Sequence, residues 1–246
     1  MTIRHGVLLA AGRGTRMGEL TAKLPKAMLE VAGSTMLSRV IDRLRSIADE
    51  VHVTVGHQGS ALAAHAIECG AASVTATTGH GNAWWLYNSL LGRIDEPVLV
   101  STCDVLAELD FDGLTADHRR LGEPPCLLVP VEPVAGVEGD FIFAEGDWVV
   151  RLTRAEPAPT YCSGLQIVNP ARIRALTEPA DDFAGVWSQL AARRALAVSR
   201  VRPASWTALD TRAHIAAISR AGAQAPAQLA AERLQAAGAE RPGDTS

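Results

Sequence analysis

The chain has 246 residues, of which 48% are hydrophobic, enough to bury the core of one large domain or two small ones. Its formal net charge of −4 provides neither the basic surface that binds nucleic acid nor an acidic tail. No apolar run approaches the roughly 18 residues of a membrane span. We therefore expect no nucleic-acid partner and no membrane attachment.

The four cysteines are spread along the chain, at Cys69, Cys103, Cys126 and Cys162. They form no C-x-x-C pair and do not cluster with histidines, which argues against a cysteine metal cage. We interpret them as reduced, mostly buried thiols of a cytoplasmic protein. The first apolar stretch breaks at once into glycine and arginine, so we read it as a buried strand and not as a signal peptide.

Strands and helices alternate from the first residues to about residue 120. Short apolar runs predict strands at 5–11, 50–56, 72–77 and 97–105. Apolar residues at helical spacing predict helices at 35–48, 60–69 and 82–94. This order is typical of a mostly parallel sheet covered by helices on both faces.

The second half of the chain is richer in strands. Strand-like segments occur at 125–131, 140–146, 148–153 and 161–169, and we expect them to extend the same sheet in mixed directions. A helix is predicted at 183–196, one or two strands at 196–211, and a closing helix at 211–222. The composition from 223 to 246 predicts a flexible tail, so the folded domain is expected to span 1–222.

A glycine-rich segment, "AAGRGTRMG", follows the first predicted strand. Glycines at such a position allow backbone N–H groups to approach phosphate oxygens. The spacing fits neither familiar phosphate motif, because Met17 stands where a dinucleotide fingerprint needs glycine and no lysine directly follows Gly18. A dinucleotide-dependent oxidoreductase is therefore disfavoured. A tight strand-to-helix turn without a ligand stays open as the alternative.

Lys23 and Lys26 are the two lysines among 23 basic residues, so the other 21 (23 − 2) are arginines. Lysine is a compact point charge on a flexible stem, whereas arginine is planar and larger. A chain that drifts toward arginine retains lysine where only lysine works. We predict that Lys26, directly after Pro25, contacts phosphate and that Lys23 lies on the surface; two lysines adjacent by chance is the alternative.

The segment "LLAAGRGTRMGELTAKLPKAMLEVAG" resembles the signature of the nucleotidyltransferases that activate sugar 1-phosphates. In that signature a strand is followed by G-x-G-T-R-M/L, a variable stretch and P-K. The segments "STCDV", "YCSGLQIVNP" and "WTALDTRAHI" resemble later landmarks of the family and occur in the same order. The resemblance covers residue 3 to about residue 220. It implies an α/β, Rossmann-like three-layer nucleotidyltransferase fold with a mixed, mostly parallel central sheet.

The resemblance also implies a reaction in which an NTP and a phosphorylated acceptor give an NDP-linked product and pyrophosphate, with Mg²⁺ as cofactor. It implies catalytic roles for Arg16 and Lys26, and Mg²⁺ ligation by Asp104 and Asp210. The acceptor-binding residues that it implies are Arg154, Ser163 and Gly164. The nucleotide-binding residues that it implies are Leu9, Ala10, Ala11, Gly12, Arg13, Gly14, Thr15, Gly81 and Asn82.

The residue types suit this chemistry. The attacking acceptor phosphate is already anionic and needs no general base, so the enzyme must align two highly charged groups and offset their repulsion. Each acid also has a simpler explanation, since Asp104 could cap a turn and Asp210 could cap a helix. Two carboxylates in one cleft repel each other. We therefore expect Asp104→Asn to leave the metal-free protein at least as stable as the parent.

The acceptor is less well defined than the reaction. Many sugar-activating members carry E-K-P after the middle strands, whereas this chain has "RLTRAEPAP", so Arg151 or Arg154 would have to bind the acceptor phosphate. A sugar 1-phosphate is favoured. The segment "GNAWWLYNSL" keeps open a cytidylyltransferase for phosphocholine or a phosphonate. A non-catalytic nucleotide-binding regulatory module is the alternative from another class, and the oligomeric state stays open.

Overall fold

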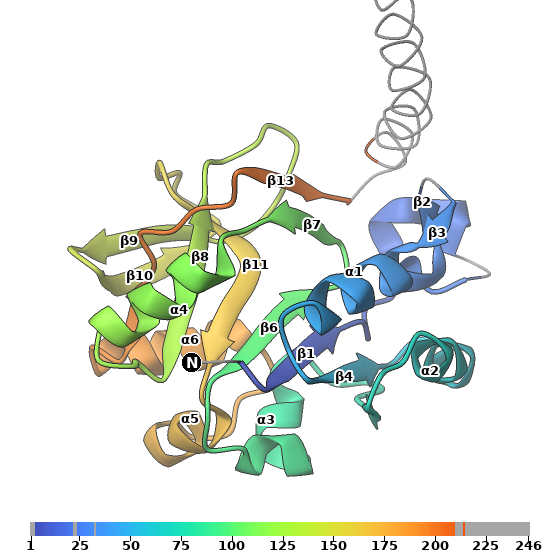
Figure 1. Cartoon of the computed structure of the whole chain (residues 1–246). Helices are drawn as coiled ribbons and strands as arrows, with labels where there is room; N and C mark the ends of the chain where they lie inside the picture. The colour runs from blue at the N-terminus through green and yellow to red at the C-terminus, as the bar shows by residue number, and fades with distance from the viewer. Residues whose placement is uncertain (1–2, 22–23, 32, 210–213, 215–246) are drawn as a thin grey trace, which may run out of the picture.

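The computed structural model describes residues 3–21, 24–31, 33–209 and 214 (Figure 1). Within them, one sheet of nine strands has the order β5-β4-β1-β6-β11-β8-β12-β10-β9. Its strands are β1 (His5–Leu9), β4 (Glu50–Val55), β5 (Ser73–Ala76), β6 (Val98–Thr102), β8 (Cys126–Val131), β9 (Phe141–Glu145), β10 (Trp148–Thr153), β11 (Tyr161–Val168) and β12 (Leu196–Val198). The predicted closing helix, apart from His214, and the predicted tail lie outside the described residues.

The sheet is mixed in direction. β5, β4, β1 and β6 are parallel, β11 is antiparallel to both β6 and β8, β12 is parallel to β8, and β10 is antiparallel to β12 and β9. All but β10 and β11 of these nine strands therefore run in the same direction. The α/β fold with a mixed, mostly parallel sheet is confirmed, and the second half of the chain does extend the sheet of the first.

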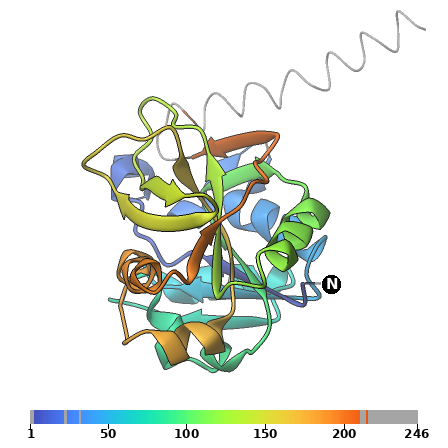
Figure 2. The ribbon, with the colours of Figure 1, turned by 90° about the vertical axis from the view of Figure 1, so that its left-hand side faces the viewer.

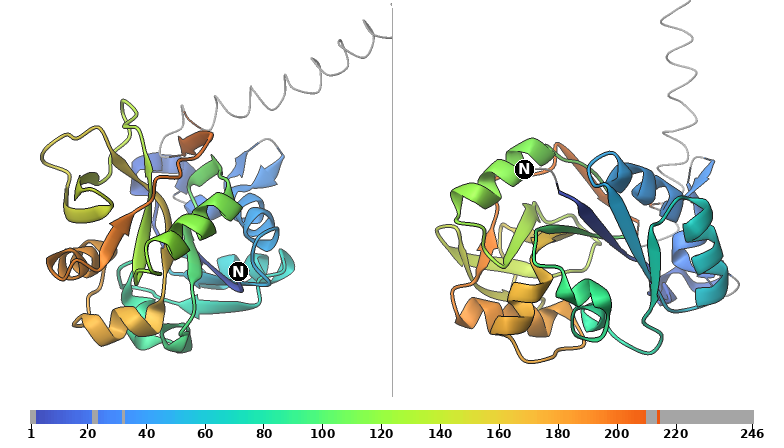
Figure 3. Two further views of the ribbon diagram at one scale, coloured as in Figure 1. Left: turned by 60° about the vertical axis from the view of Figure 1, so that its left-hand side comes forward. Right: turned by 60° about the horizontal axis from the view of Figure 1, so that its bottom comes forward.

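Helices cover both faces of the sheet (Figures 1 and 3). On one face, α1 (Met36–Arg45), α2 (Gly59–Glu68) and α4 (Phe111–Arg120) pack side chains into one buried cluster. On the other, α3 (Trp84–Asn88), α5 (Pro170–Leu176) and α6 (Phe183–Ala192) pack into a second. Successive residues of β1 alternate between them, with Leu8 in the first and Val7 in the second. These are the three layers that the sequence predicts.

Two small sheets lie outside the main one. β7 (Val105–Glu108) pairs with β13 (Ser205–Ala208), and β2 (Glu30–Val31) pairs with β3 (Ser34–Thr35). Figure 2 shows β13 beside β7 at the edge of the main sheet. The remaining elements are the short 3₁₀ helices η1 (Thr15–Thr21), η2 (Lys26–Met28) and η3 (Leu90–Arg93).

The helix predicted at 82–94 is interrupted. α3 ends at Asn88, Ser89 is extended with φ −130° and ψ 167°, and a separate turn, η3, follows. Arg174 of α5 donates to the carbonyl oxygens of Leu86 and Tyr87 at 3.0 and 2.7 Å. The last carbonyl groups of α3 thus find a partner in another helix instead of in a further helical turn.

The strand predicted at 97–105 is also divided. β6 ends at Thr102, a turn contains Cys103 and Asp104, and β7 begins at Val105 in a different sheet. β7 leaves the main sheet because it pairs with β13, a segment about one hundred residues later in the chain. No local sequence pattern predicts this pairing. The turn between β6 and β7 places Asp104 at the carboxyl end of β6.

The described cysteines form no disulfide bond, with Cys103 and Cys126 buried and Cys69 and Cys162 half-buried. Burial raises the pKa of Cys162 to about 12 and raises that of Cys126 well above its usual value. Such thiols stay protonated near neutral pH and are poor nucleophiles. Among the described helices, none combines the length and the apolar character that a bilayer crossing needs.

A buried carboxylate fastens α4 to the chain after β12. Asp117 accepts hydrogen bonds from the Ser199 hydroxyl at 2.7 Å, the Arg200 backbone N–H at 2.9 Å and the Arg120 guanidinium at 2.7 Å. Burial alone would raise the pKa of Asp117, but the bonds from Ser199, Arg200 and Arg120 outweigh it and hold the pKa below its usual range. The stabilisation by this group is therefore present above about pH 4 and is lost as pH falls through the lowered folded-state pKa.

We expect Asp117→Asn to lower the free energy of unfolding by about 1–3 kcal/mol near neutral pH, because it removes the charge that three donors share. Urea denaturation of the variant and the parent measures the difference. The control is Asp112→Asn, an exposed acid in the first turn of the same helix, which should cost under about 1 kcal/mol. The difference in the free energy of unfolding between the parent and Asp117→Asn should become smaller below about pH 4. A difference that becomes larger there would contradict this account.

Candidate active site

The carboxyl ends of β1, β4 and β6 meet at a cavity of about 280 Å³. Ligands of open α/β sheets bind in this crevice, where the loops diverge from the strand ends. Twelve residues line it: Leu9, Ala11, Gly12, Gly14, Lys26, Thr54, His80, Gly81, Asn82, Thr102, Cys103 and Asp104. The structure thus brings together, from five separate segments, most residues that the sequence assigns to the nucleotide.

The glycine-rich loop leaves β1 between its two neighbouring strands. The Ala10 backbone N–H donates to the Thr54 carbonyl at 3.1 Å, and the Cys103 N–H donates to the Leu9 carbonyl at 3.1 Å. Gly14 has φ +65°, and a Cβ there would lie 2.8 Å from the Cβ of Lys26. Position 14 therefore requires glycine both for its left-handed backbone and for the close approach of Lys26.

Lys26 and Asp104 form an ion pair inside the cavity. The Lys26 ammonium donates to Asp104 Oδ2 at 2.7 Å, and the exposed fractions of the two side chains are 9% and 26%. Burial alone would raise the pKa of Asp104, but the charge of Lys26 and hydrogen bonds from Lys26 and Thr102 hold the pKa below its usual range. Asp104 therefore presents an anionic oxygen to the cavity at neutral pH, the kind of group that Mg²⁺ prefers.

This pair revises the expected electrostatics of Asp104. The sequence suggested a carboxylate whose main neighbour is a second acid, so that removing its charge would cost no stability. Instead a cation of the chain itself, 78 positions away, offsets its charge. The revised expectation is that Asp104→Asn destabilises the substrate-free protein.

The backbone of Asp104 is held by the end of β13. The Leu209 N–H donates to the Asp104 carbonyl oxygen at 2.8 Å, directly after the β7–β13 ladder ends. Asp210 itself lies outside the described residues, as does the side chain of Arg16. Their roles as metal ligand and as phosphate contact stay predictions.

The loop that carries Gly81 and Asn82 is fastened to the start of α6. The Gly81 N–H donates to Asp181 Oδ2 at 2.7 Å, and Asn82 Oδ1 accepts from the Phe183 N–H at 2.9 Å. A Cβ on Gly81 would lie 2.3 Å from the Asp181 carbonyl oxygen, so a side chain there would displace that loop. These contacts hold this wall of the cavity in place without a ligand. The Asn82 side chain already has a structural partner.

The two adjacent tryptophans differ in position. Trp85 is fully buried in the core, while Trp84 is half-buried and stacks on His80 with ring centroids 4.5 Å apart. His80 also lines the cavity. Trp84 thus reaches the cavity wall through its contact with His80.

A smaller hollow of about 120 Å³ adjoins the cavity and shares Thr102 and Asp104 with it. Ser163 and Gly164 line this hollow. Gly164 has φ +84°, and a Cβ there would lie 2.7 Å from Thr102 Oγ1, which explains the glycine of the "SG" segment. The Trp206 indole N–H donates to the Ser163 carbonyl at 2.9 Å and fixes this wall. Asp104 therefore stands where two adjacent binding volumes meet.

Some predicted residues lie apart from the two hollows. Arg154 pairs with Asp140 through its Nε at 3.1 Å and is not among the lining residues. Arg151 pairs with Glu156 at 2.6 Å and lies over the ring of Phe143. Neither arginine is held in the site in this arrangement. Ala10, Arg13 and Thr15 belong to the same loop as Gly12 but do not line the cavity.

Sequence reasoning did not identify several lining residues. Thr54 and Thr102 occupy equivalent positions beside Leu9 on the two strands that flank β1. Trp206 and Tyr161 line the smaller hollow. A polar residue near the end of an otherwise apolar strand was the available signal for Thr54 and Thr102. Trp206 offered none, because its role depends on the pairing of β13 with β7.

Comparison with known proteins finds similarity to nucleotidyltransferases. The family model of the MobA-like NTP transferase domain matches residues 6–124. The chain is 28% identical over 206 residues to N-acetylmuramate alpha-1-phosphate uridylyltransferase of Caulobacter vibrioides. This alignment covers 76% of the present chain and 84% of the relative. It is 34% identical over 169 residues to bifunctional protein GlmU of Streptococcus pyogenes, covering 67% of this chain but spanning only 36% of that relative.

Solved structures show the same fold at low sequence identity. The inositol-1-phosphate CTP transferase from T. maritima superposes with a TM-score of 0.72 at 15% identity, covering 87% of this chain and 92% of that one. The apo form of a UDP-glucose pyrophosphorylase gives a TM-score of 0.68 at 15% identity, covering 92% and 100%. Residues 6–124, just under half of the chain, thus match the MobA-like NTP transferase domain, and the relatives named here are nucleotidyltransferases.

Proposed function

We propose that this protein joins the NMP group of an NTP to the phosphate of a sugar 1-phosphate and releases pyrophosphate. The observation that carries the proposal is the position of the Lys26–Asp104 pair, at the junction of a larger and a smaller hollow. The larger hollow suits the nucleotide and the smaller one the acceptor. The named relatives, a uridylyltransferase and GlmU proteins, support a phosphorylated sugar as acceptor.

In this proposal the chain positions charge and performs no proton transfer. An acceptor phosphate oxygen attacks the α-phosphorus, the bond to the β-phosphate oxygen breaks, and pyrophosphate leaves with the electron pair of that bond. The backbone of Gly12 and Gly14 borders the triphosphate. Lys26 offsets the phosphate charge from inside the cavity, and Arg16 is assigned to the leaving phosphates by resemblance.

The residues present fit a Mg²⁺ ion. Asp104 is an ionised carboxylate that borders both hollows, and Mg²⁺ is bound in proteins by one or two carboxylates together with substrate phosphates and water. Asp210, the residue after Leu209, is the proposed second ligand. Bound Mg²⁺ would reduce the repulsion between the two phosphate groups. Lys26 would then exchange its contact with Asp104 for one with phosphate.

A pyrophosphate-release assay with each of the four NTPs, Mg²⁺ and a panel of acceptors tests the proposal. The panel contains hexose and amino-sugar 1-phosphates, inositol 1-phosphate, phosphocholine and a phosphonate. We expect release with a sugar 1-phosphate, stoichiometric with an NDP-linked product seen by mass spectrometry. Preferred turnover of phosphocholine or the phosphonate with CTP would replace the sugar by the alternative acceptor. Thermal stabilisation by NTP without release for any pair would favour the regulatory module.

A further inference from the structure

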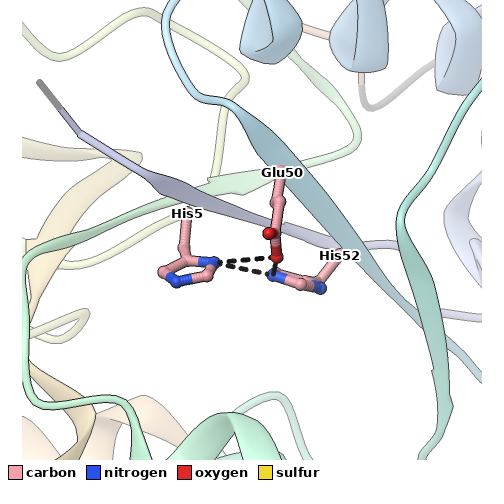
Figure 4. A group of neighbouring side chains, drawn as sticks. All are labelled: His5, Glu50 and His52. Atoms are coloured by element: carbon pink, nitrogen blue, oxygen red, sulfur yellow. Dashed lines mark hydrogen bonds and ion pairs between the residues drawn. The ribbon is translucent and has the colours of Figure 1, made fainter.

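A group of metal-type ligands lies at the amino ends of the strands, the opposite end of the sheet from the candidate active site. His5 begins β1, and Glu50 and His52 stand at the start of β4; their side chains point toward one another (Figure 4). The parallel register pairs His5 with Glu50 and Val7 with His52, which places all three side chains on one face. The group lies at one end of β1 and the glycine-rich loop at the other, about 13 Å apart along the strand.

Three ligand atoms converge on one point. His5 Nδ1 lies 3.1 Å from His52 Nε2 and 3.5 Å from Glu50 Oε2, and the last two atoms are 3.9 Å apart. Around a tetrahedral Zn²⁺ with ligands at about 2.0–2.2 Å, neighbouring ligand atoms are about 3.4 Å apart. One proton can join the two histidines, but the Glu50 oxygen is then beyond an ordinary hydrogen bond of either nitrogen. The three separations therefore suit one cation placed between the three atoms.

The outer contacts of the histidines match those of metal-binding imidazoles. His5 Nε2 lies 3.0 Å from Glu96 Oε1, and a carboxylate only accepts, so in a neutral imidazole this contact puts the proton on Nε2 and turns the Nδ1 lone pair toward His52 and Glu50. His52 Nδ1 lies 2.8 Å from the Ser73 hydroxyl. Metal-binding histidines usually contact a carboxylate or another oxygen through their second nitrogen, which fixes the ring orientation.

The two histidines of the group are more buried than the glutamate. The side chains of His5 and His52 are 13% and 7% exposed, whereas that of Glu50 is 44% exposed. The protein therefore encloses the two imidazoles and leaves the carboxylate side accessible, which gives an ion a route of entry.

We propose that His5, Glu50 and His52 form a binding site for Zn²⁺ or a similar divalent transition-metal ion, with water in the fourth position. Two imidazoles and one carboxylate suit Zn²⁺, whereas Mg²⁺ prefers oxygen ligands alone. The bound ion joins the amino ends of β1 and β4. The site is separate from the Mg²⁺ proposed at Asp104, and its occupancy does not depend on nucleotide.

Equilibrium dialysis of the chelator-treated full chain against Zn²⁺, with metal analysis by mass spectrometry, measures occupancy. The Asp104→Asn chain serves as the background, so that binding at the active site is removed. We expect saturable binding of one Zn²⁺ per chain, a rise in Tm with Zn²⁺, and with Co²⁺ a visible absorption band typical of tetrahedral coordination.

The matched variants are Glu50→Gln and His52→Gln, with His65→Gln as control. His65 contacts Glu68 and Cys69 and is not a member of the proposed site. We expect the first two changes to weaken Zn²⁺ binding at least tenfold and His65→Gln to leave it unchanged. Glu50 is partly exposed, so Glu50→Gln tests the site even where His52→Gln fails to fold. Absence of saturable binding, binding unaffected by Glu50→Gln, or binding lost in His65→Gln overturns the proposal.

Discussion

Asp104→Asn is expected to reduce nucleotidyl transfer by about 1,000-fold or more, since it removes the anionic ligand proposed for Mg²⁺. It is also expected to lower the free energy of unfolding of the substrate-free protein by about 1–3 kcal/mol, because the buried Lys26 ammonium loses its charged partner. Initial rates of pyrophosphate release and urea denaturation measure the two effects. Glu108→Gln, at the exposed end of β7, is the matched control and should change neither quantity appreciably.

A double-mutant cycle separates charge pairing from other effects of the Asp104 change. Lys26→Met combined with Asp104→Asn leaves no unpaired charge, so the double variant should be more stable than the two single changes predict by addition. The pKa of Asp104 is lowered in the fold, so the stabilisation by its charged form is present above about pH 4 and disappears as pH falls through the folded-state value. Additive single effects would show that the pair contributes nothing to stability.

Much of the fold follows from local patterns. The start of β1, β4 and α1 and the order of alternating strands and helices could be predicted because apolar spacing reports which residues face a core. In the fold, the Thr35 hydroxyl caps α1 by accepting from the Ser38 N–H at 3.1 Å. Local periodicity cannot report where one element meets another, and this explains the interruption of the helix at Ser89 and of the strand at Cys103.

The candidate site divides in the same way. The shared position of Gly14 and Lys26 in the cavity could be predicted from a short motif, since both lie in one stretch of the chain. The contact between Lys26 and Asp104 could not, because it depends on the path of the chain over 78 positions. The pKa of Asp104 depends on this contact and could therefore be inferred only once the fold was known. The group of His5, Glu50 and His52 was invisible for the same reason, since its members meet only through the register of β1 and β4.

The second large effect is expected from Lys26→Arg. Lys26 is 7% exposed, and its Cβ stands where a side chain on residue 14 would have to lie, so the space around its stem is fully used. A guanidinium is larger and planar and cannot occupy the position of the ammonium beside Asp104. We expect the variant to fold, because a positive charge still faces Asp104, but kcat/KM should fall about 100-fold.

The matched control is Lys23→Arg, the same change at the other lysine, and kcat/KM should stay within about threefold of the parent, which corresponds to roughly 0.7 kcal/mol. The comparison is informative because both substitutions conserve charge and differ only in position. If compactness of the cation is what the site requires, Lys26→Arg loses activity while NTP still raises Tm. Equal activity of the two variants would instead mean that any cation suffices at Lys26, and that the retention of lysine there reflects chance.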